Sequence, residues 1–162
     1  MIERVRNAII PALNTFCGAP IIEADQTGDK PAGPHATFKF TSTRIKDVGQ
    51  AEEKPIQTDT TYKLQRVEQY KIVISITAFD EAVDGSEALA NKIYDWFEFY
   101  GADTLAANNI AVVSKTNIQN RDIFIADYYE RRNGFDVTIR VTNTIEREID
   151  YIDTVNTTET VN

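Results

Sequence analysis

The chain has 162 residues, 42% of them hydrophobic and 26% charged, which fits one globular domain and excludes wholesale disorder and collagen-like or low-complexity chains. Its 25 acidic and 17 basic residues give a net charge of -8. Because such a chain repels phosphates, its composition disfavours general binding of nucleic acid.

Cysteine and histidine each occur once, which excludes an internal disulfide framework, a multi-cysteine zinc site and a histidine-rich metal site. No apolar run approaches the roughly 20 residues that a membrane span needs. The first apolar stretch is short and is broken by Pro11 and Asn14, so we do not read it as a signal peptide. These features favour a soluble intracellular protein without a membrane partner.

The spacing of apolar residues predicts a helix over residues 3–16, bent or started late by Pro11 and ended by Gly18 and Pro20. Its apolar face holds Val5, Ile9, Leu13 and Phe16. A short strand at Ile21–Ile22 follows, and then a loop over residues 25–34, which are rich in glycine and proline.

Alternating apolar and polar residues predict a strand over 35–41 and a long one over 64–79. The polar stretch between them, residues 45–62, is predicted to be a long hairpin connection or a protruding loop, and loops of that length are usually functional or disordered. A second helix is predicted from Asp84, with Glu87 completing a capping box and Gly101 following its last turn. Its apolar stripe comprises Leu89, Ile93, Trp96, Phe97 and Tyr100.

Residues 102–109 suggest a helical turn or loop, and strands are predicted at 110–114 and 123–132. Asn133-Gly134 is the typical pair of a type I′ hairpin turn, which would lead into a last strand from Phe135 to about Tyr151. The predicted class is α+β: two layers, a mostly antiparallel sheet with two main helices packed on one face. We expect a single domain over residues 1–153 and a flexible tail over 154–162.

No motif indicates catalysis: phosphate-binding glycine loops and a nucleophile elbow are missing from the sequence. Cys17 is predicted to be buried and His35 to lie exposed at a strand end, so the pair is not expected to act as nucleophile and base. Asp80, Glu81 and Asp84 are better explained as a solvated turn than as ligands of a cation. We therefore expect no catalytic residue, no metal site and no cofactor.

Three carboxylates, those of Glu146, Glu148 and Asp150, alternate along the end of the last strand and would share one face of it. That face is either ordinary solvated surface or an acidic surface with a function. The second alternative stays open because three neighbouring carboxylates repel one another and no basic partners for them are visible in the sequence. The mixed aromatic and basic segment Tyr128–Arg132 is not expected to bind nucleic acid in so acidic a chain.

Several segments in this order resemble the neck or tail terminator proteins of tailed bacteriophages, over about residues 2–141. They are the helical segment Arg6–Leu13, the Ala24–Gln26 loop, the strands Pro34–Phe40 and Gln69–Phe79, the helix start Gly85–Ala90 and the segment Tyr128–Val137. The resemblance implies a small α+β subunit of a hexameric ring at the head-proximal end of the tail tube. Such a ring stops tube growth and contacts the head connector, and the family offers no catalytic residues to transfer.

On this reading the chain is a structural virion protein, assembled in the host cytoplasm, whose partners are its own copies, the tail tube protein and the head-connector protein. Val48, Glu52, Glu53 and Ile56 in the polar 45–62 segment are predicted to contact a neighbour or the tube. Glu146, Glu148 and Asp150 are predicted to face a channel through which DNA passes without specific binding. The alternatives are another ring-forming virion part (a head completion or tail tube protein), a monomeric binding domain, or an enzyme using Cys17 or the carboxylates.

Overall fold

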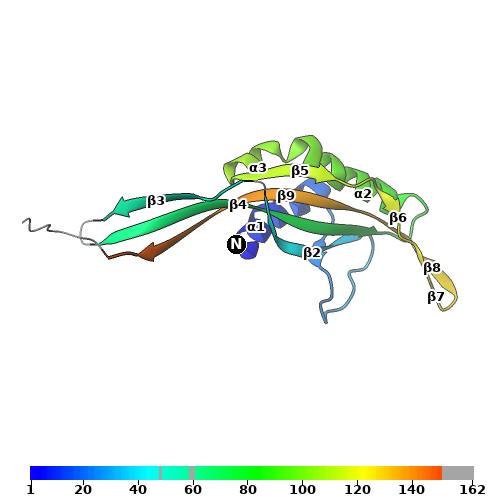
Figure 1. Cartoon of the computed structure of the whole chain (residues 1–162). Helices are drawn as coiled ribbons and strands as arrows, with labels where there is room; N and C mark the ends of the chain where they lie inside the picture. The colour runs from blue at the N-terminus through cyan, green and yellow to red at the C-terminus, as the bar shows by residue number, and fades with distance from the viewer. Residues whose placement is uncertain (48, 59–60, 151–162) are drawn as a thin grey trace, which may run out of the picture. The chain divides into compact units, whose positions relative to one another are not determined.

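The computed structural model describes residues 1–47, 49–58 and 61–150, and Figure 1 traces its elements. Its helices are α1 (Ile2–Cys17), α2 (Gly85–Asp95) and α3 (Ala102–Ala107), with a π-helical turn, η1 (Trp96–Tyr100), between the last two. The strands are β1 (Ile21–Glu23), β2 (His35–Lys46), β3 (Glu52–Gln57), β4 (Tyr62–Phe79), β5 (Ile110–Lys115), β6 (Gln119–Asn120), β7 (Ile123–Ile125), β8 (Tyr128–Glu130) and β9 (Arg132–Glu148).

The main sheet has seven strands in the order β1-β2-β4-β9-β5, with β3 beside β4 and β6 beside β9. β1 runs parallel to β2, and the other pairings for which the register is described in this sheet are antiparallel. β7 and β8 form a separate two-stranded hairpin. The predicted α+β class with a mostly antiparallel sheet is therefore confirmed.

Contacts divide the chain into two units, residues 1–47 with 69–142 and residues 48–68 with 143–162. The first unit holds the helices and the core, and the second holds β3 and the adjoining ends of β4 and β9. The predicted boundary between one domain and a flexible tail stays a prediction, because residues 151–162 lie outside the described part of the chain.

Helix α1 forms because apolar side chains recur every three or four residues, and the predicted residues Val5, Ile9 and Leu13 are buried. The helix begins at Ile2 and runs through Pro11, so of the two effects predicted for Pro11, a bend or a late start, the late start is wrong. It ends where predicted: Gly18 adopts a left-handed conformation (φ 64°), and its N–H donates to the carbonyl of Asn14.

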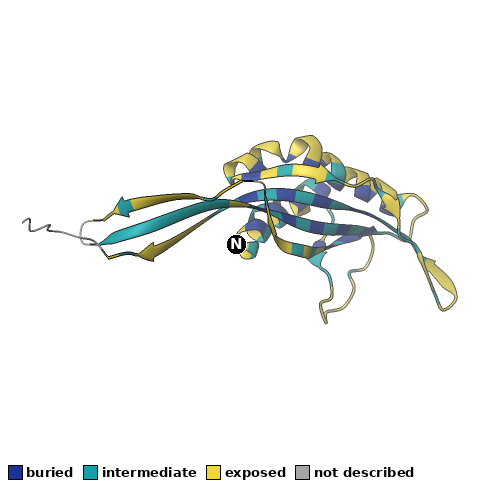
Figure 2. Ribbon diagram, in the orientation of Figure 1, coloured by how far each residue is buried: buried dark blue, intermediate teal, exposed yellow. Residues whose placement is uncertain are grey.

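One side of the strands in the first unit is buried against the helices. In β4 the buried residues are Tyr70, Ile72, Ile74, Ile76 and Ala78, and in β9 they are Phe135, Val137, Ile139 and Val141. Figure 2 shows this alternation as dark-blue positions on both strands. The predicted period of two is thus confirmed, and it places the helices on a single face.

The segment predicted as a long loop contains strand β3, so that prediction is wrong for residues 52–57. β3 pairs antiparallel with β4, Glu52 opposite Val67 through Gln57 opposite Tyr62. None of the described residues of this segment is buried, which fits its polar composition. The strand was missed because a strand without a buried face lacks the alternation of apolar and polar residues by which strands are recognised.

The predicted turn at Asn133-Gly134 is also wrong, because both residues lie in β9 and pair with Asn120 and Gln119 of β6. The chain instead reverses between β7 and β8, at Ala126-Asp127, where Ala126 has φ 56°. The predicted strand over 123–132 is therefore two short strands and their turn. Gly134 is needed for close packing, because a Cβ atom there would lie 2.4 Å from the carbonyl oxygen of Ile76.

Replacing Gly134 with alanine is expected to destabilise the fold by about 1–3 kcal/mol, because the backbone of β4 must move to admit the methyl group. The measurement is chemical denaturation followed by circular dichroism. Gly28→Ala is the matched control, since a Cβ atom at Gly28 meets nothing within 4 Å. Equal stability of the two variants would contradict this account of Gly134.

Two details of the second helix differ from expectation. Asp84 is the N-terminal cap of α2, but its side chain makes no capping hydrogen bond. Tyr100, predicted to lie in the apolar stripe, is 61% exposed. The π-helical turn η1 is the physical reason, because its wider turn shifts the register of Tyr100 at its end.

Candidate assembly surfaces

The second unit is a small sheet made of β3 and the adjoining ends of β4 and β9, and β3 pairs antiparallel with β4. No described residue of this unit is buried. In Figure 2, β3 and the ends of β4 and β9 that belong to this unit carry only exposed and intermediate colours. Small sheets need a hydrophobic face or a packed helix for stability of their own. A sheet built this way is suited to being covered by another molecule.

The described residues of both sets predicted as functional lie in this sheet or directly after it. Glu52, Glu53 and Ile56 lie on β3, and Glu146 and Glu148 lie on β9, with β4 between the two strands. Asp150 is exposed just after β9, whereas Val48 falls outside the described residues. The pairing that joins these two segments of the chain is not evident from the sequence, because it links positions far apart in the chain.

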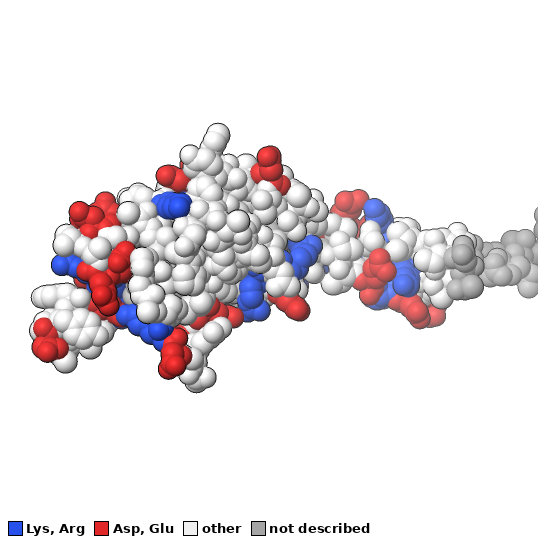
Figure 3. Space-filling view, turned by 180° about the vertical axis from the view of Figure 1, so that it is seen from behind, with Lys and Arg blue, Asp and Glu red and all other residues white. Residues whose placement is uncertain are grey.

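The acidic row, Glu146, Glu148 and Asp150, showed no basic partners in the sequence, but the structure provides one. The carboxylate of Glu146 accepts a hydrogen bond from Gln65 at 3.0 Å and lies 3.5 Å from the ammonium group of Lys63. These contacts, first the hydrogen bond from Gln65, hold the pKa of Glu146 below its usual range. Figure 3 shows acidic and basic atoms side by side over these strands.

The opposite face of the same sheet carries apolar as well as charged side chains. Because side chains alternate, Leu64, its partner Pro55 and Ile145 lie on the side that Lys63, Gln65 and Glu146 do not occupy. Arg66 donates to Glu53 at 2.9 Å on that side and to Glu68 at 3.3 Å. Both faces of this sheet therefore mix charged and apolar side chains, and both are open to a partner.

The first unit presents the β7–β8 hairpin, whose side chains include three exposed aromatic rings. Phe124, Tyr128 and Tyr129 are 60%, 55% and 67% exposed, and the rings of Phe124 and Tyr129 lie 5.0 Å apart. The base of the hairpin is held by Asp122, which accepts the backbone N–H of Arg132 at 2.6 Å. That hydrogen bond is the main cause of the lowered pKa of Asp122.

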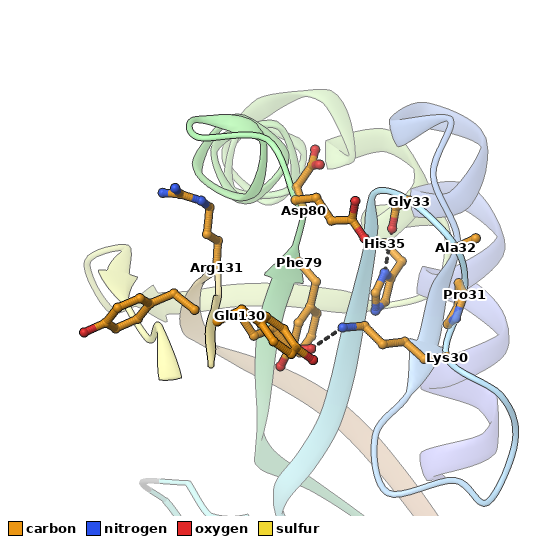
Figure 4. Close-up of a pocket in the computed structure, with 12 residues that line it drawn as sticks. Lys30, Pro31, Ala32, Gly33, His35, Phe79, Asp80, Glu130 and Arg131 are labelled. Carbon is orange, nitrogen blue, oxygen red and sulfur yellow. Dashed lines mark hydrogen bonds and ion pairs between the residues drawn. The ribbon is translucent and has the colours of Figure 1, made fainter. Parts of the chain in front are cut away.

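A groove of about 560 Å³ lies between β8, the end of β4 and the loop before β2 (Figure 4). A smaller hollow of about 260 Å³ adjoins it and shares Lys30, His35, Phe79 and Glu130 with it. Glu130 accepts from Lys30 and from Arg132, so the two sides of the groove are joined by ion pairs. Burial opposes ionisation of Glu130, but these hydrogen bonds outweigh it and keep its pKa below the usual range.

His35 was predicted to be exposed, and that prediction is wrong: it is 3% exposed and lines the groove. Its ring stacks on Phe79 with centroids 4.9 Å apart, and its Nδ1 lies 2.9 Å from the carbonyl oxygen of Gly33. The alternation that placed His35 on the polar face is broken because β2 begins at this residue, where the preceding loop covers it.

Cys17 is buried, as predicted, and burial raises the pKa of its thiol while the charge of Lys92 partly opposes this effect. A raised pKa disfavours the reactive thiolate, and no contact joins Cys17 to His35 among the described residues. Within the same part of the chain, no group of three His, Cys, Asp or Glu residues is arranged to hold a metal ion. No helix there is long and apolar enough to cross a membrane.

An α+β subunit whose accessible features are a coreless sheet, an aromatic hairpin and a groove has the surfaces of a protein that assembles with others. The family model described as phage neck terminator protein matches residues 5–162. The chain therefore belongs to the phage neck terminator protein family, the kind of family that the sequence resemblance indicated. A search of curated proteins finds no match. Membership makes the chain a structural protein of the phage neck that associates with other virion components.

Proposed function

We propose that copies of this chain form a ring, of six subunits, that caps the head-proximal end of the phage tail tube and joins it to the head connector. The family match over residues 5–162 carries this proposal. The coreless β3-β4-β9 sheet supports it, because such a sheet gains stability when another subunit or the tube covers it.

In this role the chain acts by binding and shape rather than by catalysis, and it enters the virion during assembly in the host cytoplasm. DNA passes through the ring without specific binding, and the net charge of -8 favours weak contact with phosphates. The partners are the tail tube protein on one side of the ring and the head-connector protein on the other.

Quantitative mass spectrometry of purified particles tests the proposal by counting copies of the chain. About six copies per particle are expected, located by electron microscopy at the junction of head and tail. One or two copies would contradict the ring. Many copies along the tail would identify a tube protein, and a position inside the head would identify a head completion protein.

A further inference from the structure

Two charged clusters lie at opposite ends of the strands of the first unit. Strand β2 begins at His35, which pairs with Phe79, and ends at Lys46, which pairs with Tyr70. At about 3.3 Å per residue, the two ends of β2 are roughly 36 Å apart. Side chains at one end therefore cannot reach the other end of the same chain.

The first cluster is acidic and borders the groove. Asp80 and Glu81 line the groove just after β4, and the exposed Asp84 follows them. No ion pair from the described residues reaches any of the three. The carboxylate of Asp80 accepts the N–H of Ala82 at 3.0 Å, which fixes the turn, so Glu81 and Asp84 are the freer charges.

The other groups of the groove are also suited to a cation. Tyr128 and Tyr129 offer exposed ring faces, which attract ammonium and guanidinium groups. Since the Gly33 carbonyl can only accept, Nδ1 of His35 is the donor, and in the neutral ring Nε2 is an acceptor. No group in the described part of the chain bonds to that Nε2.

The cations that line the groove are not the ones that these groups would bind. Lys30 is paired with Glu130, and the guanidinium of Arg131 points away from His35 (Figure 4). The groove therefore combines free carboxylates, exposed aromatic rings and an unused acceptor on a side chain that is only 3% exposed. Each of these groups interacts favourably with a lysine or arginine side chain.

The second cluster is basic and lies at the other end of the strands. Asp47 pairs with Lys71 at 2.7 Å and with Arg140. Arg44 lies over the ring of Tyr70 at 4.2 Å, and Arg4 donates to the carbonyl of Thr142 at 3.1 Å. The exposed cations of the cluster are Arg4, Arg44 and Lys46.

We propose that the basic cluster of one copy docks against the acidic groove of the next, in a head-to-tail contact between copies of this chain. The charges are complementary, and their separation along β2 requires that the two clusters belong to different molecules. A contact between two different patches is heterologous, and repeating it closes a ring when the rotation fits. The inference rests on the proposed ring and names the surfaces that form it.

Charge reversal at each end, and at both ends together, tests the contact. Glu81→Lys with Asp84→Lys, or Arg4→Glu with Lys46→Glu, is expected to lower incorporation into particles about tenfold, because like charges then face each other. The four changes combined in one chain restore opposite charges and are expected to recover incorporation. Asp95→Lys with Asp103→Lys, exposed on α2 and α3, is the matched control and is expected to behave as wild type.

A disulfide trap gives a second readout that does not depend on infectivity. In a Cys17→Ser background, Lys46→Cys with Asp84→Cys is expected to give a ladder of cross-linked multimers when particles are oxidised, whereas either cysteine alone gives no ladder. Wild-type incorporation of both end-reversed variants, no recovery in the combined variant, or no ladder would overturn the head-to-tail contact. Six copies at the neck without a ladder would reject only this contact, whereas a ladder from copies located elsewhere would reject the proposed function.

Discussion

Truncation of the β3–β4 hairpin is expected to abolish the joining of heads to tails while leaving the first unit folded. Deleting residues 52–67 connects Ala51 directly to Glu68 and removes β3 together with the end of β4 that pairs with it. None of the deleted residues that the structure describes is buried, so the core of the first unit keeps all its apolar contacts. Electron microscopy of lysates shows whether heads and tails join, and thermal unfolding shows whether the first unit persists.

A point variant distinguishes the effect of altering the surface of β3 from the effect of shortening the chain. Ile56→Asp places a charge at a half-buried apolar position of β3 and is expected to impair assembly. Gln57→Asp adds the same charge at the adjacent, exposed position, which faces the other side of the strand, and serves as the matched control. Normal tail length and head joining in the truncated variant would show that this sheet is not an assembly surface.

Reversal of the acidic row, Glu146, Glu148 and Asp150, is expected to make the proposed ring bind DNA. Replacing Glu146, Glu148 and Asp150 with lysine raises the net charge from -8 to -2 and, if these side chains line the channel, brings several lysines near the phosphates. Binding of duplex DNA that weakens steeply with added salt is the expected result. The fold should change little, because all three side chains are exposed.

The control for this reversal matches the change in charge at another place. Asp95, Glu98 and Asp103, all exposed on the helical segment, are replaced with lysine. If both variants bind DNA equally at each salt concentration, net charge alone explains the binding, and the result gives no support to a position of the acidic row in the channel. A structure of the ring with Glu146 on its outer rim would also reject the channel position.

The sequence by itself determined the elements whose signal is local. The buried rows Ile72, Ile74 and Ile76 in β4 and Val137 and Ile139 in β9 follow from a period of two. The end of α1 follows from Gly18, because glycine adopts the left-handed backbone conformation at almost no cost in free energy. The order of these elements was also sufficient for the resemblance to neck terminators, because family likeness depends on linear order.

Only the tertiary structure decided the features that depend on contacts between distant segments. Asn133-Gly134 forms no turn because β6 pairs with it and the backbone of β4 packs closely against Gly134. His35 is buried because the preceding loop covers the start of β2, although its own alternation predicts exposure. The pairing of Glu146 with Lys63 and Gln65 likewise joins residues about 80 positions apart, and local sequence carries no record of such neighbours.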